Sequence, residues 1–234
     1  MANKDYLRNS SKGKTEDQDL AWRYFYEPEK ISKCIGKKAN PKYVSDADFD
    51  NMLVRVLEKL NHKQRALAKT GVEEEAVLEV KPVCFMGYND KGLMHLGDDE
   101  QWRGSEYEVT WLFFGSEEIY LHRIIFSLID DEKKEETEEY FYKDVTSMST
   151  VNDSKSITVS YWGDDPNGAK EGGCMGIGRK PKQVVLEDKK EVEFDEFVIS
   201  VMGDKFRCSM EGMHEDAEEI IKGVKTLLRS KKFQ

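Results

Sequence analysis

Cysteine is scarce in this chain, and the few cysteines stand far apart. Cys34, Cys84, Cys174 and Cys208 form no Cys-x-x-Cys pair, whereas a structural zinc site needs closely spaced ligands. A disulfide framework belongs to secreted chains, and the polar segment Met1–Ser11 contains no apolar signal core. We therefore expect four reduced thiols, some of them buried as small apolar side chains.

Long apolar runs are missing as well. No window of the sequence approaches the ~18 consecutive apolar residues that cross a membrane as a helix. Because no signal segment begins the chain either, we expect a soluble, cytoplasmic protein.

Basic residues are also not in excess in this chain. The 46 Asp and Glu outnumber the 36 Lys and Arg, so the formal net charge is −10, and the chain as a whole does not attract nucleic acid or anionic lipid. One local exception places lysines near the aromatic run Trp22–Tyr26, a combination that suits single-stranded nucleic acid. These lysines are Lys30, Lys33, Lys37, Lys38 and Lys42. Because the rest of the chain is acidic, we expect no nucleic-acid partner.

The sequence holds no recognisable catalytic, cofactor or metal motif. Its four histidines are dispersed, without a His-Glu-x-x-His pair or an assignable Ser-His-Asp set. His122 lies within an apolar run, where we expect a satisfied structural residue rather than a ligand. The acidic segment Asp130–Glu139 lacks the central glycine and alternating ligands of an EF-hand loop. We therefore predict no catalytic, cofactor-binding or metal-binding residue, and no cofactor.

The glycine-rich segment Gly173–Lys180 resembles a phosphate loop only superficially. Such a loop has Lys and then Ser or Thr directly after its second glycine, followed by a helix. Here Arg179 replaces that lysine and Pro181 blocks the helix, so a connecting loop over 163–181 is the default. Cys174 lies near the two basic residues that end the segment, and nearby cations make a thiol more acidic, so a redox-sensitive thiol is a further hypothesis.

What the sequence does contain is a stretch rich in aromatic and β-branched residues, Tyr107–Val151, around which we expect the fold to form. It divides into three antiparallel strands, at 107–114, 119–129 and 138–150. Gly115–Ser116 is the predicted reversal between the first two. The second of these strands carries apolar residues on both faces, and the first does so in its later part, so we expect both faces to be covered there.

The segments around this stretch are predicted to complete the sheets. The charged connection Asp130–Glu139 is expected to be a solvated loop or a short helix. Val151–Trp162 is predicted to be a hairpin with its turn at Asn152–Ser154, and Met202–Asp204 is predicted to be a tight turn. Further strands are expected at 82–87, 157–162, 182–187, 193–201 and 205–210.

Amphipathic helices are predicted on both sides of the strands. The first spans about residues 45–71, and its apolar side chains form one stripe, Phe49–Leu67, which either covers the sheet or pairs with another chain. A shorter helix is expected over Val72–Glu79. The last helix, His214–Lys232, has acidic residues in its first turn and basic residues at its end, as the helix dipole favours.

The N-terminal segment is predicted to be an arm. Residues 1–16 have little to bury, and Pro28 is placed to begin a short helix that Gly36 ends. The aromatic run Trp22–Tyr26 either docks the arm onto the main domain or forms a partner-binding patch. Docking is favoured, because large exposed apolar patches are uncommon on monomers.

A run of strands followed by a single amphipathic helix allows that helix to close the open end of a strongly bent sheet. Two segments carry a family resemblance. Tyr142–Met148 is similar to a tyrosine-x-aspartate-isoleucine-x-serine strand pattern, and Met202–Phe206 precedes the last strand and helix. Over about residues 105–232 the sequence thus resembles the pleckstrin-homology-like (PH-like) fold, in particular the bacterial PH-like domains. The resemblance implies a binding or assembly module, not catalysis.

The resemblance also bears on lipid binding. Animal relatives of the family bind inositol phospholipids through basic residues in the loop between the first two strands. The corresponding loop here, Gly115–Glu118, is acidic, so we do not expect lipid binding by that route.

Together these expectations define an α+β chain, a PH-like antiparallel β-roll or barrel of about seven strands closed by a C-terminal amphipathic helix. We predict an N-terminal helical appendage over residues 1–80 and the PH-like domain over residues 81–234. The predicted function is a non-catalytic module for protein–protein interaction or self-assembly. The alternative is a module that binds a small ligand or a lipid head group, and an undetected enzyme is the third hypothesis.

Overall fold

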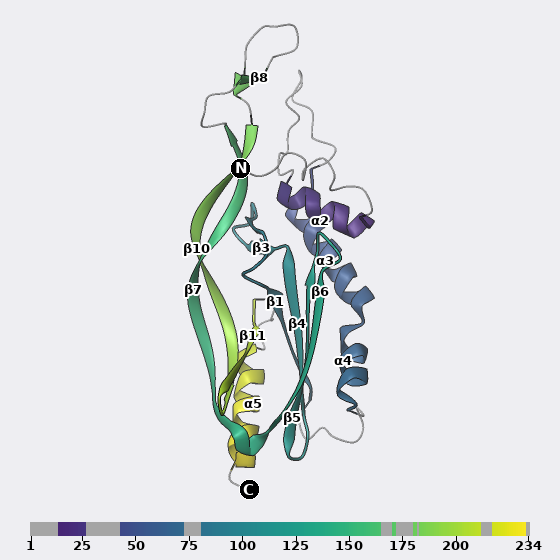
Figure 1. Cartoon of the computed structure of the whole chain (residues 1–234), viewed down its shortest axis with the longest axis vertical. Coiled ribbons are helices and arrows are strands. Elements are labelled where there is room, and N and C mark those ends of the chain that lie inside the picture. Colours follow the sequence, from purple (N-terminus) through teal and green to yellow (C-terminus); the bar gives the residue numbers. More distant parts are fainter. Residues whose placement is uncertain are drawn as a thin grey trace.

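Two sheets face each other in the described part of the computed structural model, with helices on one outer face and one helix between the sheets at one end (Figure 1). The structure describes residues 14–26, 43–72, 81–164, 170–171, 180–181, 183–211 and 217–232. Within these residues no helix is long and apolar enough to cross a membrane. The predicted α+β class is confirmed.

Helices come first in the described chain, strands follow, and a helix closes it. The helices are α2 (Glu16–Tyr26), α3 (Asp46–Leu60), α4 (His62–Thr70) and α5 (Ala217–Lys232), with a 3-10 turn η1 (Tyr142–Asp144). The strands are β1 (Val83–Tyr88), β2 (Met94–Leu96), β3 (Trp102–Gly104), β4 (Glu106–Phe114), β5 (Glu118–Ser127), β6 (Lys133–Phe141), β7 (Val145–Asp164), β8 (Lys170–Glu171), β9 (Lys180–Pro181), β10 (Gln183–Val201) and β11 (Asp204–Ser209). The short strands β2, β3, β8 and β9 were not anticipated from the sequence.

The first sheet has the strand order β1-β4-β5-β6, and all of its pairs are antiparallel. Leu112 of β4 lies opposite Val83 of β1 and Leu121 of β5, so apolar side chains gather on one face of the sheet. Strands β4 and β5 are buried on both faces, as predicted from their apolar residues. Their reversal is at Gly115, whose N–H donates to the Glu118 carbonyl at 2.8 Å.

The second sheet has the order β11-β10-β7-β2-β3. β7 and β10 pair along nearly their whole length and form a ribbon that extends past the end of β4 (Figure 1). β2 joins β7 through a single parallel pair, Met94 with Val159. The tight turn predicted at Met202–Asp204 is confirmed, and Gly203 adopts the φ of 90° that this turn requires.

Two predicted interruptions of the ribbon are wrong. β7 continues without a turn through Asn152–Ser154, and β10 joins the strands predicted at 182–187 and 193–201 into one. The polar residues at 152–154 are exposed, and the Asn152 amide donates to the Asp195 carboxylate across the pair at 2.9 Å. A solvated strand carries polar side chains as readily as a loop does, so composition could not separate the two.

The loop or short helix predicted over Asp130–Glu139 is wrong for most of its length. After a short turn, Lys133–Phe141 forms β6 at the edge of the first sheet. Some of its charges have partners on β5 and on α4, such as Arg123 of β5, which lies 3.4 Å from Glu136, and Lys69 of α4, which lies 3.9 Å from Glu135. Charged side chains on an edge strand discourage pairing with other chains, which is why so polar a segment can occupy this position.

The described strands form three open sheets, of four, five and two strands, rather than a closed barrel, since no strand order returns to its first strand. The two-stranded sheet is the β8–β9 pair. The predicted barrel closure is therefore absent from the described residues. The closing helix is confirmed over Ala217–Lys232, and its predicted first turn falls partly in 212–216, outside the described residues. The domain boundary predicted at residue 80 also lies outside them and stays a prediction.

The core between the sheets includes one side of α5. Ile221, Val224 and Leu228, spaced three and four residues apart, join this core from the helix. Phe85 of β1 and Phe197 of β10 stack between the two sheets, with ring centroids 5.0 Å apart. The helix thus fills one end of the space between the sheets with close-packed side chains.

Helix α3 begins where the sequence predicts. The Ser45 hydroxyl accepts from the Asp48 N–H at 3.2 Å, and the Ser45 N–H donates to the Asp48 carboxylate at 3.1 Å, so the two form a capping box. The single helix predicted over 45–71 is wrong in one respect, because Asn61, with a left-handed φ of 47°, separates α3 from α4. Gly71 ends α4 as predicted, and the next predicted helix lies almost wholly in 73–80, outside the described residues.

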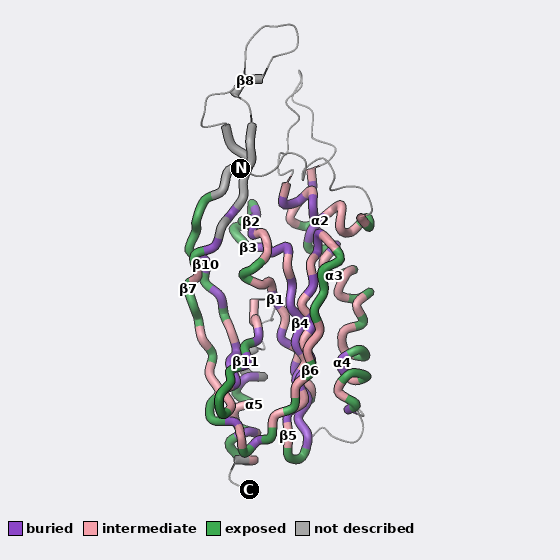
Figure 2. The backbone as a smooth tube through the Cα atoms, viewed as in Figure 1, coloured by how far each residue is buried: buried purple, intermediate pink, exposed green. Residues whose placement is uncertain are grey.

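Helices α2, α3 and α4 cover the outer face of the first sheet (Figures 1 and 2). The stripe of α3 is internal, since Phe49 and Met52 are buried in one cluster with Ile124 of β5. The favoured docking of the aromatic run is confirmed, because Trp22 and Phe25 of α2 are buried in the same cluster. Because these side chains are buried, they are not exposed for binding to another chain. The helix predicted between Pro28 and Gly36 lies outside the described residues.

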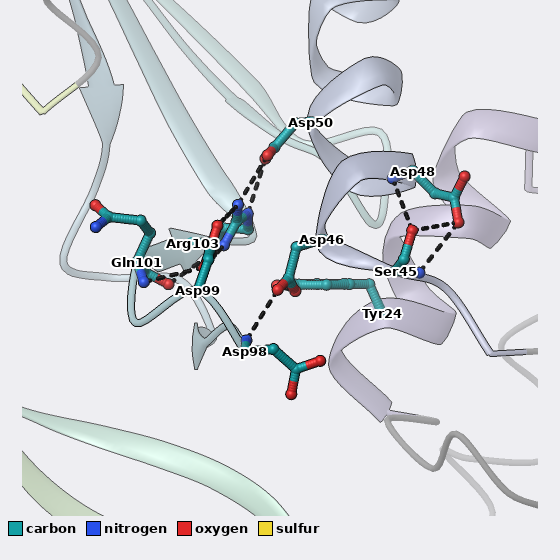
Figure 3. Close-up of polar contacts among 9 residues, drawn as sticks. All are labelled: Tyr24, Ser45, Asp46, Asp48, Asp50, Asp98, Asp99, Gln101 and Arg103. Atoms are coloured by element: carbon teal, nitrogen blue, oxygen red, sulfur yellow. Dashed lines mark hydrogen bonds and ion pairs between the residues drawn. The ribbon is translucent and has the colours of Figure 1, made fainter.

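A buried arginine joins α3 to the β2–β3 connection (Figure 3). Arg103 donates through Nε and Nη2 to Asp50, both at 2.8 Å, and through Nη1 and Nη2 to Asp99 at 2.9 and 2.7 Å. These bonds hold the pKa of Asp99 well below its usual range. Beside them, Asp46 accepts from the Tyr24 hydroxyl at 2.8 Å. The helical layer is thereby tied to the second sheet as well as to the first.

Arg103→Lys is expected to lower the free energy of unfolding by about 1–3 kcal/mol, because an ammonium group cannot form the planar fork that bonds two carboxylates. Urea unfolding followed by circular dichroism measures the change. Arg55→Lys is the matched control, since Arg55 makes an exposed bond to Asp17 at 3.0 Å and its loss is expected to be below about 0.5 kcal/mol. Equal losses in the two variants would contradict the role given to the fork.

Candidate functional site

A groove of about 280 Å³ lies between the start of β7 and helix α5. We call it the β7–α5 groove. It is lined by Tyr142, Val145, Thr146, Ser147, Met148, Lys225, Leu228 and Arg229. The groove therefore combines one end of a strand, one face of a helix and the 3-10 turn that precedes the strand.

The floor of the groove is apolar and firmly held. Tyr142, Val145 and Leu228 are buried members of the core between the sheets, and Met148 packs against that core. The Tyr142 hydroxyl donates to the Gly115 carbonyl at 2.8 Å, which fixes η1 to the β4–β5 reversal. The shape of the groove thus comes from the core and does not depend on a bound partner.

One edge of β7 is open beside this groove. From Val145 to Ile157, β7 pairs with β10 on one side, and no other described strand pairs with its opposite edge before Val159. In an antiparallel ladder alternate residues direct their N–H and C=O groups away from the partner strand. Because no described strand uses these groups between Val145 and Ile157, a further strand could pair with them, as at an uncovered sheet edge.

The rim of the groove is basic. Lys225 and Arg229 are four residues apart on α5 and therefore share one face of the helix. Lys225 is half-buried and Arg229 is exposed, and neither forms an ion pair with a residue that the structure describes. In a chain with a net charge of −10, this places positive charge beside an apolar floor and an open strand edge.

A second concave region, of about 400 Å³, lies between the polar halves of the two sheets. Arg123 lies 3.6 Å from Glu108 there and packs over the Phe206 ring with a 4.0 Å separation. Lys155 lies 3.0 Å from Glu196 across the ribbon. Burial raises the pKa of Glu108, and the charge of Arg123 opposes this shift. The charges of this cleft neutralise one another and leave little to attract a charged ligand.

The histidine and the cysteines discussed from the sequence lie in different environments. His122 is fully buried under α4, and neither of its ring nitrogens has a hydrogen-bond partner among the described residues, so the expectation of a satisfied side chain is wrong. Cys84 and Cys208 are free thiols, as predicted, and burial raises the pKa of Cys84 to about 12, which makes it a poor nucleophile. Cys174 lies outside the described residues.

Two further sequence hypotheses fall outside the described part of the chain. The basic patch at Lys30–Lys42 lies in 27–42, and the phosphate-loop-like segment lies almost wholly in 172–179. Within the described residues, no group of three or more His, Cys, Asp or Glu is placed to hold a metal ion.

The sequence drew attention to the segments that line the β7–α5 groove but did not predict that they lie together. Tyr142–Met148 attracted attention as a family-like strand, and the basic residues of α5 were explained by the helix dipole. The available signal was the four-residue spacing of Lys225 and Arg229, which places two cations on one face of an amphipathic helix.

Comparisons with protein-family models, with curated proteins and with solved structures each found no match to this chain. Its function is therefore inferred from its own geometry.

Proposed function

We propose that the protein is a non-catalytic PH-like binding module that docks an extended protein segment in the β7–α5 groove. Support for the PH-like fold comes from the connectivity. The strands β1, β4, β5 and β6 form one antiparallel meander, interrupted by the short β2–β3 pair, and β7, β10 and β11 form another. A single amphipathic helix follows and inserts its apolar side between the two sheets.

The observation that carries the binding proposal is the open edge of β7 beside an apolar floor. An extended segment can add to this edge as a further strand, with backbone hydrogen bonds to β7 and alternate side chains directed into the groove. Val145, Met148 and Leu228 would receive apolar side chains. Because the backbone supplies much of the contact, the segment needs only a simple pattern of side chains.

The positive charge of the rim of the groove determines which kind of protein segment would bind. Lys225 and Arg229 lie where side chains that do not enter the groove would pass α5. Carboxylates at those positions would pair with the two cations, whereas basic side chains would be repelled. The proposed partner is therefore a protein segment in which acidic side chains alternate with apolar ones.

A displayed library of random linear peptides, selected on the full chain, is the probe. We expect the selected peptides to alternate acidic and apolar residues. In fluorescence polarisation with one synthetic selected peptide, Lys225→Glu with Arg229→Glu should weaken binding about tenfold or more. The control pair Lys189→Glu with Lys190→Glu makes the same charge change on the exposed ribbon and should leave the affinity within about twofold.

Strand addition is tested on the peptide itself. N-methylation at every second residue should abolish binding in one register, where the N–H groups face β7, and should be tolerated in the other. The proposal is wrong if the selected peptides lack acidic residues. It is also wrong if the peptide still binds whichever of the two registers is N-methylated. Self-association lost in the Lys225 and Arg229 variant would identify a second copy of the chain as the partner.

The alternative of a small-ligand binder would use the charged cleft between the sheets. Its cations already pair with carboxylates, as Arg123 does with Glu108 and Lys155 with Glu196. A charged ligand would have to displace these pairs and restore their hydrogen bonds. The β7–α5 groove needs no such exchange and is favoured for that reason.

A further inference from the structure

Helix α4 is held to the first sheet by a small cluster of its own. The helix has nine residues, and the buried members of the cluster are Ala66, Val72 and Phe113, with Leu67, Trp111 and Tyr120 packed around them. A helix of this length is unstable in water by itself. An element with few buried apolar contacts also opens at a low cost in free energy. Its attachment therefore depends strongly on the polar groups within the same contact.

The first of these polar groups is His62, the first residue of α4. Trp111 of β4 donates its Nε1–H to His62 Nδ1 at 2.8 Å, and the two rings stack with centroids 5.7 Å apart. A ring nitrogen accepts such a bond only when it carries no proton, so the contact requires a neutral imidazole with its hydrogen on Nε2. Burial lowers the pKa of His62, and no described charged group contributes to this shift.

The second is His122 of β5, which is fully buried and has no hydrogen-bond partner among the described residues for either ring nitrogen. Charged groups face it from two elements, Arg65 and Lys69 from α4 and Glu135 and Lys133 from β6. Burial lowers the pKa of His122, Glu135 opposes this, and the three cations add to it. A positive imidazolium at this site would thus be poorly solvated and would compete with other cations for one carboxylate.

We propose that His62 and His122 form an acid-sensitive latch, and that protonation of the two imidazoles releases α4 and uncovers Trp111, Phe113 and Tyr120. While α4 is attached, neither ring takes up a proton without breaking the Trp111 bond or placing an unsolvated charge under the helix. After release both rings are solvated and titrate like ordinary histidines. Acid therefore favours the released state. This inference concerns elements other than the β7–α5 groove and does not rest on the binding proposed there.

The size of the effect follows from proton uptake. The attached state binds fewer protons, so its stability is complete above the ordinary histidine pKa and falls as the pH drops below it. Each histidine raises the ratio of released to attached α4 by up to about tenfold between pH 7.5 and 5.5, and the pair by up to about 100-fold. Burial alone would raise the pKa of Glu135, but hydrogen bonds from Arg65 and Lys133 outweigh it and hold this pKa below its ordinary value. Glu135 therefore stays ionised over this pH range and takes up no proton.

Hydrogen–deuterium exchange of the full chain, read by mass spectrometry on peptides that cover His62–Thr70, measures the release. After correction for the intrinsic pH dependence of exchange, protection of α4 should fall by up to about 100-fold from pH 7.5 to 5.5. Peptides from β4 and β5 should keep their protection, since the sheet remains paired. Unchanged protection of α4 across this range would overturn the proposal, as would an equal loss across the whole chain.

Variants separate the latch from general acid sensitivity. His62→Gln keeps an acceptor for Trp111 that does not titrate, and His122→Phe removes both unsatisfied nitrogens, so each change should remove about tenfold of the pH response and the double variant nearly all of it. His95→Gln is the control, because His95 is half-buried on β2 against Tyr24, away from α4, and should leave the response unchanged. A double variant that responds like the original chain would refute the latch.

Discussion

Phe197→Ala is expected to lower the free energy of unfolding by about 3–5 kcal/mol, because a cavity remains where a large buried ring is removed. Phe197 and Phe85 are both fully buried, and their rings stack with an interplanar angle of 5°. Since the two rings come from different sheets, the substitution also weakens the contact that holds the sheets face to face. Urea unfolding followed by circular dichroism and by tryptophan fluorescence measures the loss.

Met202→Ala is the control for this prediction. Met202 follows β10 directly and is 82% exposed, so its removal should change the free energy of unfolding by less than about 0.5 kcal/mol. Phe85→Ala should lower the free energy of unfolding by about as much as Phe197→Ala does. The loss in the double variant should be about 0.5–1.5 kcal/mol smaller than the sum of the two single losses, because the direct ring contact is removed only once. A loss below about 1 kcal/mol for Phe197→Ala would contradict the core assigned between the sheets.

Phe49→Ala should cost about 3–5 kcal/mol for the same physical reason, applied to the helical layer. Phe49 of α3 is fully buried, stacks on Tyr24 at 4.4 Å and meets Phe25 edge-on at 5.6 Å. It therefore joins α2 and α3 to the outer face of the first sheet. The measurement is urea unfolding with two probes, near-ultraviolet circular dichroism for the aromatic cluster and far-ultraviolet circular dichroism for the sheets.

This variant also tests the predicted division into residues 1–80 and 81–234. If the helical layer and the sheets unfold as one unit, both probes should shift together in a single transition. A separate early transition of the aromatic cluster alone would instead support an independent appendage. Val54→Ala is the matched control on the same helix, since Val54 is 54% exposed and its loss should stay within about 0.5 kcal/mol.

The helices show how far sequence reasoning reaches. The start of α3 at Ser45, the end of α4 at Gly71 and the apolar side of α5 depend on residues within a few positions of one another, so their patterns are complete in the sequence. The left-handed Asn61 is also a local feature, but asparagine adopts that conformation only occasionally, and the apolar stripe continues past it.

The strands show where such reasoning fails. β6 is too charged to be recognised alone, and β7 and β10 contain polar stretches that resemble turns or loops. Each is a strand because a distant segment supplies its hydrogen bonds, β5 for β6 and β10 for β7. Pairing of this kind depends on the tertiary arrangement, and local propensity is too weak to decide against it.

The groove and the latch follow the same division. The sequence determined that Lys225 and Arg229 share a helix face, that Val145–Met148 belongs to a strand, and that an amphipathic helix follows the strands, because each property depends on local spacing. It did not reveal that Tyr142–Asp144, expected in the same strand, forms a 3-10 turn. Only the tertiary structure decided that α5 lies beside the open edge of β7, that His62 bonds to Trp111 and that His122 is buried beneath α4. Those encounters depend on how the sheets pack and where their edges remain free, since the contacts join segments that are far apart along the chain.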